Sequence, residues 1–377
     1  MSYIKINLNE VNVGQALPWA VFDGEGKLLL RKGYILNSRH QLEVLMERGL
    51  FRNKSEEGAS NDDEEFPDLD DQDLSPFQMV THICGRLQNV FDSYQAHPDK
   101  FVSSIMRISD DVLELCKTDP DAGLGAVHLY NDFRYTVIHP VHQALIAAIV
   151  ASAREMDDDT QRSLIAGALT ANIAMNELQE ELHTQTDPLT DEQRDRIYDH
   201  PDEGFKLLRK LGVKDELWLR IVEQHHERVD GSGYPASLQS DEICLEAKLV
   251  AIADRYTAMV STRNYRQAIH AKDALKNFFV SKGKEFDEEL SLFFIKCLGI
   301  FSPGTFVKLA NNEIGVVIRR CSDNSMNPVV SCFVTPSGGH YVHPFIRDTS
   351  DTEFAIRETC EKPQETPLNL HILWGYN

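Results

Sequence analysis

The sequence predicts a mainly α-helical protein with a small αβ module at its N-terminus and a small β appendage at its C-terminus. Between Ser75 and about residue 300, apolar residues recur three and four positions apart, as Met79, Ile83 and Leu87 do, and this spacing is typical of amphipathic helices. Before residue 55 and after Pro303 the apolar runs are short and strand-like. A chain of 377 residues, 42% of them hydrophobic, can form two or three domains with a sizeable core.

The N-terminal module is expected over residues 1–54. The run Phe-Asp-Gly-Glu-Gly-Lys at 22–27 is typical of a β-hairpin turn, and residues 28–30 are expected to form the strand that follows it. A short helix is expected over 38–49, where a serine can cap the first turn. Residues 55–74 are rich in Asp and Glu and poor in apolar residues, which indicates a flexible acidic linker.

The helical part divides into a connector over 75–132 and a domain over 133–301. Breaks that contain Pro, Gly or Asp separate its helices. Helices are expected near 76–97, 100–117, 140–155, 159–182, 201–211, 215–228, 243–261, 269–281 and 286–299. The β appendage is expected over 302–377, with strands near 306–309 and 314–318 joined by an Asn-Asn turn.

Composition and charge argue against several classes of function. The net charge of −21 opposes binding to a nucleic acid polymer, because no dense basic patch offsets the repulsion of phosphates. The longest strongly apolar stretch, residues 144–153, is far shorter than the ~20 residues of a membrane-spanning helix, and the N-terminus lacks a signal pattern. Seven single cysteines favour buried, reduced thiols over disulfides or a thiolate zinc cluster. We therefore expect a cytoplasmic protein with no membrane partner.

Five side chains on the predicted helices are candidate metal ligands. They are His139, His200, His225, His226 and Asp254. Imidazole nitrogens with a carboxylate suit Zn, Fe or Mn, and converging helices commonly form such sites in the core of a bundle. Taken singly, each histidine is more often a packed core residue or a surface residue, so the prediction rests on their combination.

The most informative stretch is residues 225–235, which read His-His-Glu-Arg-Val-Asp-Gly-Ser-Gly-Tyr-Pro. It joins two adjacent imidazoles to a tight glycine turn. Together with His200-Pro201, Ile252-Ala253-Asp254 and Arg263-Asn264-Tyr265-Arg266, this stretch resembles the HD-GYP family of bacterial signalling phosphodiesterases. The resemblance covers about residues 133–301.

The resemblance implies an HD-GYP-type helical bundle with a metal-dependent activity. In that family two or three metal ions, commonly iron or manganese, activate a water that hydrolyses cyclic di-GMP, since paired cations lower the pKa of the water and neutralise charge on the phosphoryl oxygens. The matching ligands here would be His139 as the first histidine, His200 before proline, the pair His225 and His226, and Asp254 as the last carboxylate.

The chain departs from the family at residues 169–175, which align with the family's His-Asp-x-Gly-Lys. Ala171 and Asn172 replace the His-Asp pair and Met175 replaces the lysine, so no catalytic residue is expected to be intact there. Without the bridging carboxylate, two dications ~3.5 to 4 Å apart lose much of the charge that screens them. The dinuclear centre is therefore expected to be broken.

One metal position is expected to survive. His200, His225 and His226 could hold a single divalent ion, either Zn, Fe or Mn, with an open coordination position. The other position would keep only His139 and Asp254.

The resemblance also assigns residues that bind the nucleotide. In the family, basic residues after the final aspartate contact ligand phosphates, and Arg263 and Arg266 match them. Guanidinium groups suit phosphate oxygens, although surface salt bridges are an equally weighted alternative for both arginines. Tyr234 is grouped with them because it presents an amphipathic ring.

The glycine-rich loop is the predicted contact for a protein partner. In the family this loop is implicated in contacts with diguanylate cyclases that carry a GGDEF domain, and the alternative is that it only positions the His-His pair. The loop residues are Asp230, Gly231, Gly233, Tyr234 and Pro235.

Three functions follow as hypotheses. The preferred one is a non-catalytic or severely impaired HD-GYP protein that senses cyclic di-GMP or binds a signalling protein. The second is an active phosphodiesterase that works with one ion on the three histidines, with Asn172 as a weak ligand. The third is an adaptor that binds no nucleotide.

Overall fold

The computed structural model describes residues 3–5, 21–22, 28–30, 51–53, 74–261, 269–321, 324–363 and 368–376. The chain forms two compact units, Met1–Gln72 and Asp73–Asn377. The described part of the first unit is a small antiparallel sheet with the strand order β1-β4-β2-β3. Its strands are β1 (Tyr3–Lys5), β2 (Val21–Phe22), β3 (Leu28–Leu30) and β4 (Phe51–Asn53).

The predicted strand at 28–30 is confirmed, since β3 pairs with β2 in an antiparallel register. The turn residues 23–27 and the helix predicted over 38–49 lie outside the described residues. The predicted linker also lies outside them, apart from its last residue.

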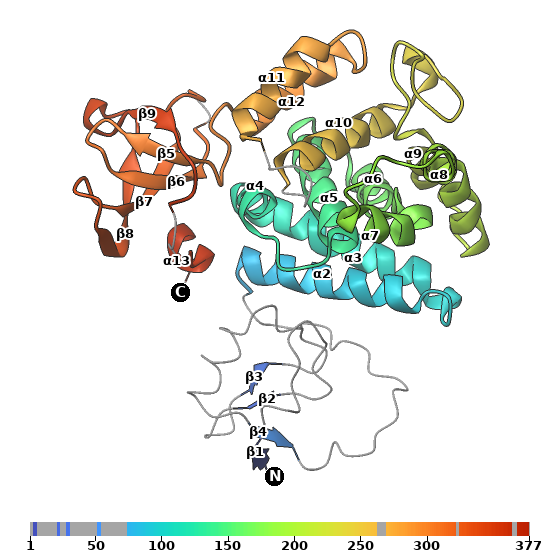
Figure 1. The fold of residues 1–377 in the computed structure, drawn as a ribbon, viewed down its shortest axis with the longest axis horizontal. Helices are drawn as coiled ribbons and strands as arrows, with labels where there is room; N and C mark the ends of the chain where they lie inside the picture. Colours follow the sequence, from blue (N-terminus) through green and yellow to red (C-terminus); the bar gives the residue numbers. More distant parts are fainter. Residues whose placement is uncertain are drawn as a thin grey trace. The chain divides into compact units, whose positions relative to one another are not determined.

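The second unit is mainly helical, as predicted (Figure 1). Its longer helices are α2 (Pro76–Ser93), α3 (Phe101–Thr118), α4 (Pro120–Leu129), α5 (Tyr135–Ala153), α6 (Asp158–Thr170), α7 (Asn176–Thr184), α8 (Asp191–Lys210), α9 (Glu216–Gln224), α10 (Leu245–Val260), α11 (Ala271–Ser281) and α12 (Glu288–Leu298). Side-chain caps fix several helix starts. Ser75 is the N-cap of α2 and Thr190 is the N-cap of α8, and each forms a capping box. Asp157 caps α6 through its carboxylate.

Helix α5 is the central helix of the unit. The helix has 19 residues, and an 18-residue window of it has a mean hydropathy of 1.4, so by length and composition it could cross a membrane; 89% of that window is buried inside the protein. The helix thus extends beyond the ten-residue apolar stretch at 144–153 that the sequence shows. Its burial on nearly all sides is the pattern of a core helix.

Two helices begin earlier than the sequence indicates. We expected prolines to mark helix starts near 140 and 201, but Pro140 lies inside α5 and Pro201 lies inside α8. The expectation was wrong because an interior proline removes one amide donor and bends the helix without ending it when packing holds both halves. As a result, His139 and His200 lie within helices. Helix α4 was not predicted at all.

The helix expected over 159–182 is broken. Helix α6 ends at Thr170, a single 3-10 turn covers Ile173–Met175, and α7 begins at Asn176. Ala171 and Asn172 occupy the break between them. The two positions that depart from the HD-GYP pattern therefore lie at a helix junction.

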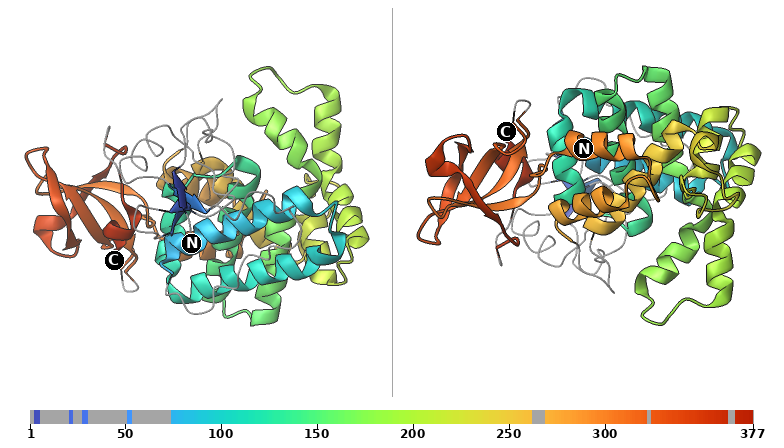
Figure 2. Two further views of the ribbon diagram at one scale, coloured as in Figure 1. Left: turned by 90° about the horizontal axis from the view of Figure 1, so that it is seen from below. Right: turned by 90° about the horizontal axis from the view of Figure 1, so that it is seen from above.

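The predicted β appendage is confirmed as an antiparallel sheet with the strand order β8-β7-β6-β5-β9. Its strands are β5 (Phe306–Leu309), β6 (Ile314–Arg319), β7 (Val329–Val334), β8 (His340–Asp348) and β9 (Ile356–Thr359), and a short helix α13 (Leu370–Trp374) follows. Both views of Figure 2 show this sheet to one side of the helices.

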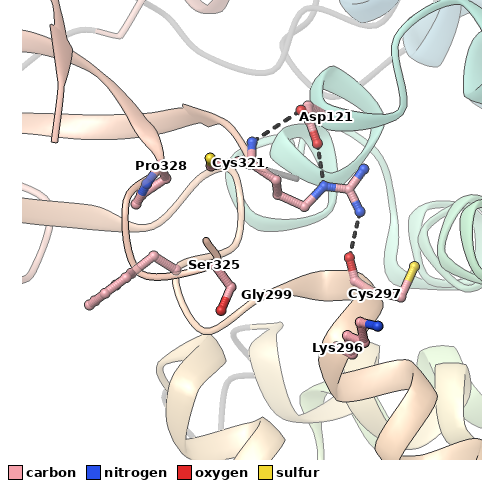
Figure 3. A pocket seen from close by; sticks show the side chains of 9 residues that line it. Asp121, Lys296, Cys297, Gly299, Cys321, Ser325 and Pro328 are labelled. Atoms are coloured by element: carbon pink, nitrogen blue, oxygen red, sulfur yellow. Dashed lines mark hydrogen bonds and ion pairs between the residues drawn. The ribbon is translucent and has the colours of Figure 1, made fainter. Parts of the chain in front are cut away.

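Charged side chains join the sheet to helix α4. Arg319 donates to Asp119 at 2.8 Å, and Arg320 at the end of β6 is paired with Asp121. The guanidinium of Arg320 also donates to the carbonyl oxygen of Cys297 at 2.6 Å. Figure 3 shows Asp121 and Cys297 on the wall of the pocket where these elements meet. Because several of these groups are half-buried, their pairing fixes the sheet against the helices.

In the turn between β5 and β6, one buried carboxylate gives stability a predictable dependence on pH. Glu313 is 1% exposed and accepts two hydrogen bonds from Arg347 at 2.8 Å and a third from Tyr341. The hydrogen bonds from Arg347 lower the pKa of Glu313 from 4.5 to about 2. A lowered pKa stabilises the fold above the pKa of the unfolded state, and this contribution disappears as the pH falls through the folded value.

We therefore expect the difference in melting temperature between the wild type and Glu313→Gln to be largest near pH 6 and to shrink between about pH 4.5 and 2. Thermal unfolding followed at several pH values measures this difference. Glu358→Gln is the control, because Glu358 is exposed on β9. A difference that stays constant down to pH 2 would contradict the prediction.

Candidate metal centre

His200 is oriented by the proline that follows it. Pro201 has no amide hydrogen to donate to the carbonyl oxygen of Ile197, four residues earlier. The Nδ1 atom of His200 lies 2.6 Å from that same oxygen and supplies the missing donor. This hydrogen bond assigns the proton to Nδ1, so Nε2 carries a lone pair.

His225 is oriented in the same way at the end of α9. The last carbonyl groups of a helix have no partner within the helix, and His225 Nδ1 lies 2.7 Å from the carbonyl oxygen of Val222. Its Nε2 lone pair faces His200, and the two Nε2 atoms are 3.2 Å apart. Two nitrogens bound to one zinc at 2.0–2.1 Å in tetrahedral geometry would lie about 3.3 Å apart. The observed separation therefore fits a shared cation.

His226 completes a group that we call the imidazole triad: His200, His225 and His226. One ligand atom from each lies within 4.8 Å of the others. Burial lowers the pKa of His200 to about 3, and it also lowers the pKa values of His225 and His226. The three rings are thus neutral at pH 7, and no proton is available to bridge the facing lone pairs of His200 and His225.

His139 and Asp254 form a second group beside the triad. The Nε2 atom of His139 on α5 donates to the Asp254 carboxylate on α10 at 2.8 Å. Burial alone would raise the pKa of Asp254, but the hydrogen bond and charge of His139 hold it below its usual value. The charge of Asp254 in turn acts on all three imidazoles of the triad, raising their pKa values against the effect of burial. The structure therefore brings the five predicted ligands together.

The departures from the family lie in the break after α6. Ala171 is fully buried, and Asn172 is 3% exposed. Among the described residues, the amide oxygen of Asn172 has no hydrogen-bond partner. Met175 is half-buried at the end of the 3-10 turn. An amide oxygen can ligate a cation weakly, but it carries no charge.

The loop after the triad is held by a buried acid that the sequence did not single out. Glu227 is 4% exposed and accepts hydrogen bonds from the amides of Ala236 at 2.7 Å and Leu238 at 3.0 Å. Asp230 accepts from the amide of Ser232 at 2.9 Å. Glu227 stands directly after the His-His pair, and this position is the signal that could have identified it.

Gly233 allows the loop to turn back on itself. A Cβ atom at this position would lie 2.4 Å from the amide nitrogen of Arg228 and 2.5 Å from the Cα of Glu227, which are backbone atoms. Gly231 has a φ of +78°, which favours glycine. The backbone conformation of the predicted partner loop therefore requires glycine at both positions. Contact of this loop with a GGDEF domain stays a prediction.

We expect Gly233→Ala to lower stability by about 1–3 kcal/mol, the usual cost of forcing a methyl group into filled space, and to weaken zinc binding. Chemical denaturation and zinc titration measure the two effects. Gly212→Ala is the matched control, since Gly212 has a φ of +91° but nothing lies within 4 Å of its added Cβ. It should lose about 1–2 kcal/mol from backbone strain and keep its zinc affinity. Equal zinc affinity in the two variants would refute the proposed effect of the loop.

Tyr234 covers the triad with its ring. Its centroid lies 4.8 Å from that of His226 with the planes 26° apart, and burial raises the pKa of its hydroxyl. On the outer side it meets Tyr198 of α8, with the centroids 4.6 Å apart. Tyr198 was not predicted as a site residue. An aromatic residue two positions before His200 is only a weak sequence signal for such a role.

Tyr135, at the start of α5, is stacked between two imidazoles. Its centroid lies 4.8 Å from that of His139 and 5.6 Å from that of His183. The predicted nucleotide-binding residues Arg263 and Arg266 lie outside the described residues. Their role stays a prediction.

Comparison with known proteins agrees with this architecture. Residues 134–290 match the family model described as an HD domain. A cyclic di-GMP phosphodiesterase of Pseudomonas aeruginosa is 29% identical over 226 residues, which are 59% of this chain and 54% of the relative. A cyclic di-GMP phosphodiesterase response regulator of Xanthomonas campestris is 30% identical over 143 residues, 38% of each chain.

The solved structure of an HDGYP protein from Bdellovibrio bacteriovorus has the same fold. It aligns with a TM-score of 0.52 at 18% identity, over 78% of this chain and 98% of that one. The chain spans about half the length of the first two curated relatives it matches. Residues 134–290 therefore match an HD domain, the chain is similar in sequence to proteins named cyclic di-GMP phosphodiesterases, and it shares its fold with an HDGYP protein.

Proposed function

We propose that this protein acts in cyclic di-GMP signalling as a catalytically impaired HD-GYP protein, which binds the nucleotide and holds one divalent cation on the imidazole triad. The observation that carries the proposal is the contrast between two halves of one site. The triad presents neutral, preoriented nitrogens, whereas the neighbouring half offers only the His139–Asp254 pair, Ala171 and Asn172.

The triad fits a cation such as Zn, Fe or Mn. The Nδ1 hydrogens of His200 and His225 are both used in hydrogen bonds to carbonyl groups, so their Nε2 lone pairs face each other at 3.2 Å. The lone pairs of two neutral Nε2 atoms at this distance repel each other. A cation between them would remove this repulsion, because each nitrogen would coordinate it. Such an ion would polarise a phosphoryl oxygen of the nucleotide.

A second cation is disfavoured by electrostatics. Two dications about 4 Å apart repel each other by roughly 16 kcal/mol at an effective dielectric constant of 20, four times the value for unit charges. In a dinuclear site a bridging carboxylate offsets much of this repulsion, and the neutral amide of Asn172 does not. His139 and Asp254 would also have to give up their hydrogen bond of 2.8 Å, which contributes about 1.5–3 kcal/mol for a charged acceptor.

The names of the relatives support cyclic di-GMP as the nucleotide. The Pseudomonas and Xanthomonas proteins are named as cyclic di-GMP phosphodiesterases. The triad, in which His200 and His225 are buried and His226 is half-buried, packs against Tyr234 of the glycine-rich loop, so a phosphate group of a bound nucleotide would reach the cation beside Tyr234. Arg263 and Arg266 are the basic residues that we expect to contact the same phosphates.

Metal content and cyclic di-GMP binding, measured on one preparation of the whole chain, test the proposal. We expect no more than one divalent ion per chain, reversible nucleotide binding and no linear product. Turnover that disappears in His226→Ala would replace the proposal with a one-metal phosphodiesterase. The absence of nucleotide binding would instead favour an adaptor.

A further inference from the structure

Tyr198 has a large exposed ring beside a buried site. Its side chain is 58% exposed, although the ring lies next to Tyr234, which is half-buried. Single exposed aromatic residues are common on protein surfaces. This one differs because it continues a series of rings that begins at the triad.

The rings lie at stacking distances from one another. Successive centroids are separated by 4.1 Å from His225 to His226, 4.8 Å from His226 to Tyr234, and 4.6 Å from Tyr234 to Tyr198. Aromatic pairs interact favourably between about 4.5 and 7 Å, and both pairs that involve Tyr234 lie in this range. The series leads from the candidate metal position to the exposed ring of Tyr198.

The charges around Tyr198 indicate which part of a nucleotide this ring can meet. Asp195 and Asp202 lie three and four residues away on the same face of α8. The basic residues of that face are already paired: Arg194 with Asp191 at 2.8 Å and Lys206 with Asp202 at 2.7 Å. With Asp202 paired to Lys206, the carboxylate of Asp195 is the group beside Tyr198 that repels phosphate, and it can accept hydrogen bonds from the N–H groups of an uncharged base.

We infer that the ring of Tyr198, which packs against Tyr234 on one side, forms an aromatic platform on which a purine base of the nucleotide stacks while its phosphate lies toward the triad. This inference rests on the proposed function and names Tyr198 as a residue that determines affinity for the base. Stacking on aromatic side chains is a general means of holding nucleobases without reading their sequence.

Calorimetric titration of cyclic di-GMP into the wild type, Tyr198→Ala and Tyr198→Phe tests the platform. Because Tyr198 is exposed, neither substitution should affect folding. We expect about tenfold weaker binding by Tyr198→Ala, within the range found when one stacked base loses its aromatic partner, and unchanged binding by Tyr198→Phe. Inorganic phosphate is the second probe, and its affinity should be the same for all three proteins.

The possible outcomes distinguish a failure of the aromatic platform from a failure of the proposed function. Wild-type binding with no loss in Tyr198→Ala overturns the platform alone. An equal loss for phosphate, or a loss in Tyr198→Phe as large as that in Tyr198→Ala, also overturns it, because the ring would then not act by stacking on a base. A wild type that binds no cyclic di-GMP overturns the proposed function and the platform with it.

Discussion

The double variant Ala171→His with Asn172→Asp is expected to bind two divalent cations per chain and to hydrolyse cyclic di-GMP at least about a hundredfold faster than the wild type. The new carboxylate would supply the charge that a pair of cations needs, and the new imidazole would add a ligand. A second cation stabilises the transition state of phosphoryl transfer by several kcal/mol, and 1.36 kcal/mol corresponds to a tenfold change in rate.

Metal analysis with manganese or iron and a product assay measure this gain of function. Ala171 is fully buried, so an imidazole there has to displace its neighbours at a cost of about 1–3 kcal/mol. Asn172→Asp alone avoids that cost because the two side chains have nearly the same shape. It should raise the manganese content without full activity.

Thermal unfolding of both variants shows whether they remain folded. If the folded double variant takes up two ions but produces no linear nucleotide, the loss of the His-Asp pair does not explain the impairment. Met175 would then be the next position to restore.

The second large effect is expected from His225→Ala, which should lower the affinity for zinc by at least about a hundredfold. Changes to residues that only orient a metal ligand already cost 10–100-fold, and His225 supplies a donor atom itself. Zinc at a hundred times its dissociation constant stabilises the wild type by about 2.7 kcal/mol. The variant should lose this stabilisation.

Isothermal titration and melting curves with and without zinc give the two quantities. His128→Ala is the control, because His128 is a half-buried imidazole that also has a lowered pKa, about 4 as a result of desolvation, but it lies outside the triad. It should melt at a lower temperature yet keep the shift that zinc produces. Retention of the zinc shift by His225→Ala would show that the cation binds elsewhere.

Much of the helical fold could be predicted from the sequence. Apolar spacing identified most of the helices, because each buries one stripe of side chains. Pro140 and Pro201 misled the prediction of helix starts, since local propensity cannot show that tertiary packing holds a helix together across a proline. Helix α4 was missed for a related reason: its ten residues contain two glycines, and Gly125 is needed where Trp374 packs against it.

The ligand set was predictable, but its arrangement was not. The histidines and Asp254 follow from the motif, whereas the direct pairing of His139 with Asp254 depends on where α5 and α10 meet. Tyr198 is far from residue 234 in the sequence, and only the folded loop places their rings together. Long-range contacts of this kind carry no periodic signal.

Pro201 has a consequence for the kinetics and entropy of metal capture. With no amide hydrogen at that position, the carbonyl oxygen of Ile197 accepts from the His200 ring instead, and a flip of the ring would break this hydrogen bond. The imidazole therefore has one favoured rotamer before any ion arrives, so little rotational freedom is lost on coordination. In a chain with alanine at 201, the amide of residue 201 would compete with His200 for the carbonyl oxygen of Ile197. The His200 ring would then adopt several orientations, and binding an ion would have to select one of them.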